Sequence, residues 1–262
     1  MTALGRGWSV TRRWGERVRR GGRKLDGARP AIRIAAIAAI TLLGLPTINL
    51  VYHVLRKPTE MFAFISSEFN KPPAETWRHY GSLFREYSTA AISPELLAAL
   101  AQVEGAGNPL ARTYWRWQLS WNPLALYQPA SSAVGMFQMT DAAFAEARRF
   151  CIRDHIVIEN GCRFNSVYIR VVPSHAIQLA AAYLDHNVER VLASHPNTKP
   201  SAEHKRELAA IVHLCGAGSA NAFAQRGFRV LTSERCGEHD VADYLVRVRA
   251  MQREFRPLAA NP

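Results

Sequence analysis

Residues 93–105, SPELLAALAQVEG, contain the features that decide the fold of this chain. The opening Ser-Pro pair suits the cap and first position of a helix, apolar residues follow with helical spacing, and nearby glycines end the pattern. Glu104 lies seven residues after Leu97 and four after Leu100, so a helix would project its carboxyl group from the apolar face. Such surroundings favour a protonated carboxyl, which is the form that a general acid needs. An exposed glutamate at a fraying helix end is the alternative.

Helical periodicity also dominates the sequence around this stretch. Apolar and aromatic residues repeat at steps of three and four in five further segments, residues 74–87, 141–150, 174–192, 201–214 and 240–255. Alternation typical of strands is confined to short pieces such as residues 167–172. The sequence therefore predicts a mainly α domain.

An apolar run precedes this domain. Residues 34–54, IAAIAAITLLGLPTINLVYHV, contain no Asp, Glu, Lys or Arg and would form a helix about 31 Å long, enough to span a bilayer. A buried core helix and a cleaved signal peptide are the alternatives, but the run is long for either. Seven basic residues lie within twenty positions before the run and three after it, so the positive-inside rule predicts a cytoplasmic N-terminus and an exported body.

The net charge of +12 is concentrated at the N-terminus. Residues 1–33 hold ten basic and two acidic residues, a net charge of +8, which leaves +4 for the rest of the chain. A cytoplasmic tail beside a membrane span accounts for this charge, so we expect no nucleic-acid partner.

Four cysteines, Cys151, Cys162, Cys215 and Cys236, all lie in the part that we expect to be exported, where disulfides persist. Three pairings are open. The favoured one joins neighbours in the sequence, Cys151 with Cys162 and Cys215 with Cys236. A buried thiol at Cys215 is the alternative.

Five short motifs follow Glu104 along the chain. They are WNPLA at 121–125, SAVGMFQM at 132–139, a proline-to-leucine helix at 173–184, GAG at 216–218, and Tyr244 with Val248. In the same order they resemble the patterns F-N-P-x-A, G-A-x-G-L-M-Q, P-x-x-N-I-x-x-G-x-x-Y-L, Y-N-A-G-P-G and Y-V-x-x-V of soluble lytic transglycosylases. The resemblance covers roughly residues 90–250 and implies a lysozyme-like helical domain preceded by one transmembrane helix.

The resemblance also implies which residues act. Glu104 is the implied catalytic acid and base. Six residues are implied to contact the substrate: Ser132, Gly135, Met136, Gln138, Tyr183 and His213. From residue chemistry alone, the Gln138 amide could instead be satisfied inside the protein. The chain departs from the family pattern where Gly105 replaces a serine and where His213 and Leu214 replace a tyrosine and an asparagine.

The implied function is that of a peptidoglycan lytic transglycosylase. Glu104 would protonate the oxygen between N-acetylmuramic acid and N-acetylglucosamine, and would then help the muramoyl 6-hydroxyl to close a 1,6-anhydro ring. Most glycosidases use two carboxylates, but Glu95 and Asp141 lie at predicted helix starts, where capping accounts for them. A hydrolytic muramidase on the same fold and a non-catalytic peptidoglycan-binding scaffold of an envelope-spanning machine are the alternatives.

We expect no cofactor and no metal site. The one-carboxylate route requires no cofactor. The nine histidines include four that are nine residues apart and so cannot share one helix face, His186, His195, His204 and His213.

The sequence divides into five predicted parts. These are a basic cytoplasmic tail (1–33), a transmembrane helix (34–55), a linker with a short helix (56–89), a lysozyme-like catalytic domain (90–256) and a tail (257–262). The predicted location is the bacterial inner membrane, crossed once, with the catalytic domain in the periplasm on peptidoglycan strands. A partner in envelope machinery is left open.

Residues 113–121, TYWRWQLSW, lengthen the stretch between Glu104 and the first motif. Their indole rings could form a wall against sugar rings or enter a membrane interface, and core packing is the alternative. For Trp121, which aligns with a family aromatic residue, core packing is the prediction. For Trp115 and Trp117 the choice is open.

Overall fold

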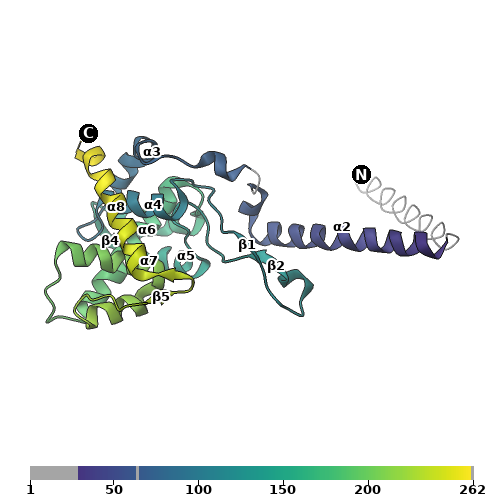
Figure 1. The fold of residues 1–262 in the computed structure, drawn as a ribbon. Helices are drawn as coiled ribbons and strands as arrows, with labels where there is room; N and C mark the ends of the chain where they lie inside the picture. Colours follow the sequence, from purple (N-terminus) through teal and green to yellow (C-terminus); the bar gives the residue numbers. More distant parts are fainter. Residues whose placement is uncertain (1–28, 63–64, 261–262) are drawn as a thin grey trace, which may run out of the picture. The chain divides into compact units, whose positions relative to one another are not determined.

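The computed structural model describes residues 29–62 and 65–260, and in them the chain is mainly helical (Figure 1). The α-helices are α2 (Pro30–Arg56), α3 (Pro73–Glu86), α4 (Pro94–Gly105), α5 (Asp141–Ala147), α6 (Pro173–Ala193), α7 (Ala202–Gln225) and α8 (Val241–Ala260). The predicted mainly α class, with one N-terminal apolar helix, is confirmed.

Short 3-10 helices and strands connect the α-helices. The 3-10 helices are η1 (Pro58–Phe62), η2 (Ser66–Phe69), η3 (Pro123–Ala125) and η4 (Arg163–Val167). The strands are β1 (Trp115–Trp117), β2 (Tyr127–Pro129), β3 (Cys151–Arg153), β4 (Ile156–Ile158), β5 (Arg235–Cys236) and β6 (His239–Asp240), which pair as β1-β2, β3-β4 and β5-β6. The strand-like piece at residues 167–172 is not a strand, because η4 and a turn occupy it.

The chain forms two compact units. The first comprises Met1–Arg56, described from residue 29, and Trp117–Gln128, and the second comprises Lys57–Arg116 and Pro129–Pro262, described to residue 260. The predicted basic tail lies outside the described residues except for its last five positions, 29–33.

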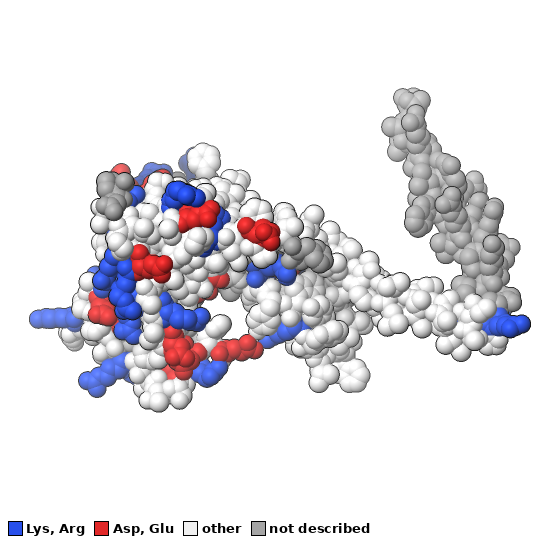
Figure 2. Space-filling model, turned by 45° about the horizontal axis from the view of Figure 1, so that its top comes forward, with Lys and Arg blue, Asp and Glu red and all other residues white. Residues whose placement is uncertain are grey.

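Helix α2 belongs to the first unit. It contains the whole predicted span of residues 34–55 and extends beyond it at both ends. It is long and apolar enough to cross a membrane by length and composition. Figure 2 shows it as a white rod that becomes blue near its N-terminal end, whereas blue and red side chains are scattered over the second unit.

The core of the second unit is built around α4. Every residue from position 96 to position 101 is buried, because this stretch of Leu and Ala lies between neighbouring helices. Helix α4 packs against α3 and α8, and α6 packs against α7 (Figure 1). The broad apolar faces of these helices therefore meet in one continuous core.

Most helix boundaries agree with the sequence, and two helices continue further than predicted. Helix α7 passes residue 214 and runs to Gln225, with a kink at Gly216, whose φ of 79° and ψ of 174° are not helical. Helix α8 runs to Ala260 and passes Pro257, so most of the predicted tail is helical. Helix α5 is shorter than predicted and ends at Ala147.

The segment before α3 is fixed to the second unit by a buried acid. Glu60 of η1 forms ion pairs with Lys57 (3.2 Å) and Arg112 (3.2 Å), and it accepts a hydrogen bond from the Trp115 indole N–H (2.6 Å). Burial lowers the pKa of the Lys57 ammonium despite this negative neighbour. Trp115 is thus a structural contact of the region predicted as a linker.

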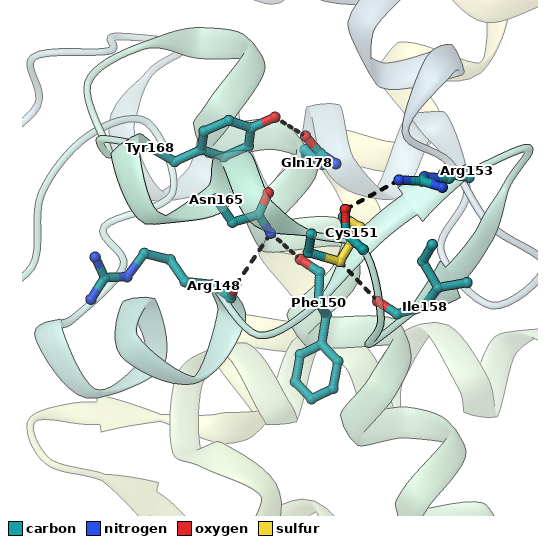
Figure 3. The surroundings of a disulfide bond; sticks show 10 residues. Arg148, Phe150, Cys151, Arg153, Ile158, Asn165, Tyr168 and Gln178 are labelled. Atoms are coloured by element: carbon teal, nitrogen blue, oxygen red, sulfur yellow. Dashed lines mark hydrogen bonds between the residues drawn. A yellow bond between two sulfur atoms is a disulfide. The ribbon is translucent and has the colours of Figure 1, made fainter.

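The two disulfides have the pairing that the sequence analysis favoured, in which each cysteine bonds to the cysteine nearest to it along the chain. Cys151 joins Cys162, eleven residues on, and Cys215 joins Cys236, twenty-one residues on, so Cys215 is not a thiol. Around the first, the Asn165 amide donates to the carbonyl of Phe150, next to Cys151 (Figure 3). The second ties the kinked part of α7 to the β5-β6 hairpin that leads into α8.

Candidate active site

Glu104 lies in the last turn of α4, where its side chain retains 18% of its exposure. Ser93 caps the start of this helix by accepting a hydrogen bond from the Leu96 amide (3.3 Å), as the opening Ser-Pro pair predicted. At the other end Ala106 adopts the left-handed conformation (φ 50°) that closes the helix. These caps fix the helix and place a partly exposed carboxylate at the edge of the apolar core.

Tyr244 of α8 is the closest polar partner of this carboxylate in the described part of the chain. Its hydroxyl donates a hydrogen bond of 2.6 Å to Glu104 Oε1. Burial, and then the negative charge of Glu104, raise the pKa of the Tyr244 phenol well above its ordinary value. Tyr244 therefore keeps its proton at physiological pH and remains a donor to Glu104.

His213 of α7 also faces Glu104. Its Nε2 lies 3.7 Å from Glu104 Oε1, an ion pair when the ring is protonated. The kink at Gly216 follows three residues later and lets the second half of α7 change direction. The site is thus made by α4, α7 and α8, and it brings Glu104 and His213 together.

The Gly135–Gln138 stretch lies against the end of α4. A Cβ atom at Gly105 would come within 2.8 Å of the Met136 Cα and carbonyl oxygen, so the two backbones touch. Gly135 has a φ of 81°, and a Cβ there would come within 2.4 Å of the Arg170 carbonyl oxygen. Only glycine fits at either position without movement of the backbone.

The Met136 side chain is fully buried, so it does not line an exposed groove, contrary to the expectation from the resemblance. Its neighbour Gln138 is partly exposed and uses its amide N–H groups inside the protein, donating to the carbonyls of Ala111 (3.0 Å) and Gly135 (2.8 Å). The amide nitrogen of Gln138 is therefore satisfied inside the protein, which was the alternative to substrate contact.

Ser132 and Tyr183 have other neighbours than Glu104. The Ser132 hydroxyl accepts from the Asp141 amide (3.1 Å). Burial, and then the charge of Glu146, raise the pKa of the partly buried Tyr183 phenol. Among the described residues, no hydrogen bond or ion pair joins either of them to Glu104.

Two roles were missed by sequence reasoning. Tyr244 was recognised as part of the last motif and not as a partner of Glu104, although a tyrosine on an otherwise apolar helix face was the available signal. Trp121 was predicted to pack in a core, but it is fully exposed and belongs to the first unit.

Within residues 29–62 and 65–260, no three His, Cys, Asp or Glu side chains gather where they could hold a metal ion.

A comparison of the sequence with known protein families identifies the family of this chain. The Transglycosylase SLT domain family matches residues 82–225, more than half of the chain. The chain belongs to this family, whose members are lytic transglycosylase-type enzymes that cleave peptidoglycan and share the lysozyme-like fold. A comparison with curated proteins finds no relative that matches.

Proposed function

We propose that this protein is a membrane-anchored lytic transglycosylase that cleaves the β-1,4 bond between N-acetylmuramic acid and N-acetylglucosamine, with Glu104 as acid and then base. The observation that carries the proposal is the hydrogen bond of 2.6 Å from Tyr244 to Glu104 Oε1, at a partly exposed carboxylate at the edge of the core. A carboxylate fixed in this way is placed by the fold and is not a mobile surface group.

The reaction needs one carboxyl group in two protonation states. Because Oε1 accepts the Tyr244 hydroxyl, Oε2 is left to carry the catalytic proton. Glu104 gives this proton to the glycosidic oxygen as the bond from the muramoyl C1 breaks. The resulting carboxylate takes the proton of the muramoyl 6-hydroxyl while O6 bonds to C1, which forms the 1,6-anhydro ring and restores the acid without water.

The two other carboxylates considered at the sequence level do not complete a glycosidase pair. Glu95 lies in the first turn of α4, nine residues from Glu104 and so about 13 Å away along the helix axis. Asp141 forms an ion pair of 2.6 Å with Arg170. This supports a one-carboxylate route over the two-carboxylate hydrolysis of most glycosidases.

Substrate contacts are proposed for the residues beside Glu104. His213 would contact the sugar ring next to the cleaved bond, in the place of the family tyrosine, because its ring already faces Glu104. Gly135 would let the backbone approach the glycan closely, since it carries no side chain. We retain Ser132, Gln138 and Tyr183 as proposed contacts further along the strand.

Anchoring of the enzyme is assigned to α2. Its described part has the length and composition of a membrane span, and basic residues are more frequent before it than after it. The enzyme would then cross the inner membrane once and act on peptidoglycan in the periplasm.

The test is digestion of purified sacculi by the full chain in detergent, with the released fragments identified by mass spectrometry. Wild type should release fragments with 1,6-anhydro ends. Glu104→Gln should slow release by at least about 100-fold, because it can neither give nor take the proton. The matched control, Glu95→Gln at the other end of the same helix, should leave release unchanged.

Other products would reject the proposal in defined ways. Reducing ends would identify a hydrolytic muramidase. No release by a folded wild-type chain that still co-sediments with sacculi would identify a non-catalytic scaffold. Circular dichroism of each variant would show that a loss of activity is not a loss of fold.

A further inference from the structure

The loop Trp117–Gln128 of the first unit exposes large apolar side chains. Trp117 is 78% exposed, and Leu119 and Trp121 are completely exposed, at 100% and 104%. No residue from position 117 to position 128 is charged. An apolar and uncharged patch of this kind marks a contact with a membrane or another molecule.

Part of the backbone of this loop is hydrogen-bonded within the loop. The Gln118 amide donates to the Leu126 carbonyl (2.9 Å). Asn122 accepts two amides, that of Leu124 with its side chain (3.0 Å) and that of Ala125 with its carbonyl (2.9 Å). Internal pairing of backbone groups lowers the cost of moving a segment from water into lipid.

The loop is held on α2 by two polar side chains of that helix. Asn49 Nδ2 donates to the Leu124 carbonyl (3.1 Å), and His53 Nε2 lies 2.8 Å from the same oxygen. Because a carbonyl oxygen only accepts, Nε2 of His53 must carry the proton. Asn49 and His53 are one turn apart on one helix face, and each is only 8% exposed. Polar groups of a membrane helix need such partners.

These contacts set the depth of the loop. Asn49 lies five residues before Val54, the end of the uncharged run, which is about 7–8 Å along the helix axis. Interfacial segments lie about 5–10 Å deep, at the boundary of headgroups and acyl chains. Trp and Tyr are the residues that favour this level. The loop therefore lies beside the part of α2 that would meet the membrane surface.

We propose that the loop Trp117–Gln128 inserts Trp117, Leu119 and Trp121 into the phospholipid interface, as a second membrane contact beside α2. The inference rests on the proposed anchoring by α2. A glycan is the less suitable partner, because several of the polar side-chain atoms that a sugar would need are already bonded within the loop. Gln128 Nε2 donates to Gln118 Oε1 (3.0 Å), and Asn122 bonds to its own loop.

The test uses the full chain in vesicles of phosphatidylethanolamine and phosphatidylglycerol, with and without bromine on the upper acyl carbons. Bromine quenches tryptophans that enter the lipid. Wild-type fluorescence should have a lipid-quenched component, and Trp117→Phe with Trp121→Phe should lose most of it. The matched control is Trp77→Phe, since Trp77 is buried in the second unit, and it should keep the component.

Each contrary result has one meaning. If the chain floats with the vesicles and resists alkaline carbonate, but the double variant keeps the whole lipid-quenched component, loop insertion is wrong and anchoring stands. If soluble glycan strands change the loop fluorescence and brominated lipid does not, the loop binds sugar and the inference fails. A chain that does not float would overturn the anchoring and the inference with it.

Discussion

At the residue scale, the proposed chemistry depends on how a single carboxylate is held. Tyr244 is buried and keeps its proton, so its hydroxyl fixes one oxygen of Glu104, and in the proposed reaction the other oxygen faces the substrate. The sequence predicted a helix that ends near Glu104, and α4 is that helix, whereas the catalytic role of Glu104 stays a prediction. The sequence could not predict the hydrogen bond, because 140 positions separate the two residues and only the packing of α4 on α8 brings them together.

Tyr244→Phe should lower kcat about 10–100-fold with little change in KM. It removes a hydrogen bond to a carboxylate, which contributes about 1.5–3 kcal/mol, from the proposed catalytic residue. The measurement is the rate of anhydro-fragment release over a range of sacculus concentrations. The control is Tyr168→Phe, which removes a hydroxyl that donates to the neutral Gln178 side chain (2.9 Å), and kcat should be unchanged. Equal losses in both variants would mean that Tyr244 has only a structural role.

Gly105 explains one departure from the family pattern. The backbone of Met136 lies so close that a Cβ atom at position 105 would come within 2.8 Å of two of its atoms. A serine, as in the family pattern, would have to push the Gly135–Gln138 stretch away from the end of α4. The glycine is therefore matched to the particular approach of these two backbones.

Gly105→Ser should destabilise the protein by about 1–3 kcal/mol, the usual cost of overpacking a close contact, and should lower activity. Thermal unfolding and the sacculus assay measure the two effects. Gly218→Ala is the matched control, because apart from its chain neighbours and its own helix backbone no atom lies within 4 Å of the Cβ it would add, and it should retain full stability. A Gly105→Ser protein as stable and active as wild type would show that the Met136 backbone moves freely.

At the element scale, the start of each α-helix in the second unit was close to prediction, because caps and apolar periodicity are local signals. The continuation of α7 was not predicted, since Gly216 has the positive φ of a residue that normally ends a helix. The helix resumes because Phe223 and its small neighbours Ala220 and Ala224 are buried in the core. That stabilisation comes from distant elements and leaves no local pattern.

The two disulfides should differ in their effect on activity. Cys215–Cys236 ties the kinked α7, which carries His213, to the hairpin leading into α8, which carries Tyr244. Loop closure gives each disulfide roughly 3 kcal/mol of stability, so either double Cys→Ala variant should lower Tm by roughly 10 °C. Well below Tm, the Cys215/Cys236 variant should lose activity and the Cys151/Cys162 variant should retain it. Equal residual activities of the two variants would show that Cys215–Cys236 does not position the site residues.

At the scale of the whole molecule, composition predicted an apolar helix and a helical domain, and both are present. The grouping of Trp117–Gln128 with α2 was not predictable. The acceptor for Asn49 and His53 is a backbone carbonyl, that of Leu124, and every residue has one. A contact made through such an atom cannot be recognised in the sequence, whereas a candidate membrane span can be recognised by its length and lack of charge.

The charge distribution makes a prediction about the orientation of the whole chain. Seven basic residues lie within twenty positions before the uncharged run and three after it, so the N-terminus should be cytoplasmic. In intact spheroplasts, added protease should digest the second unit and leave an N-terminal epitope tag protected. Detergent should expose the tag, which confirms that the membrane protects it.

Neutralising the basic residues near the span should weaken this orientation. Replacement by Gln of five of the seven leaves two before the run against three after it: Arg17, Arg19, Arg20, Arg23 and Lys24. We expect part of this variant to expose its tag and protect its second unit, because the charge bias that retains the N-terminus has gone. The control replaces Arg6, Arg12 and Arg13, which lie more than twenty residues from the run, and should keep the wild-type orientation. A wild-type pattern in both variants would show that something other than these charges sets the orientation.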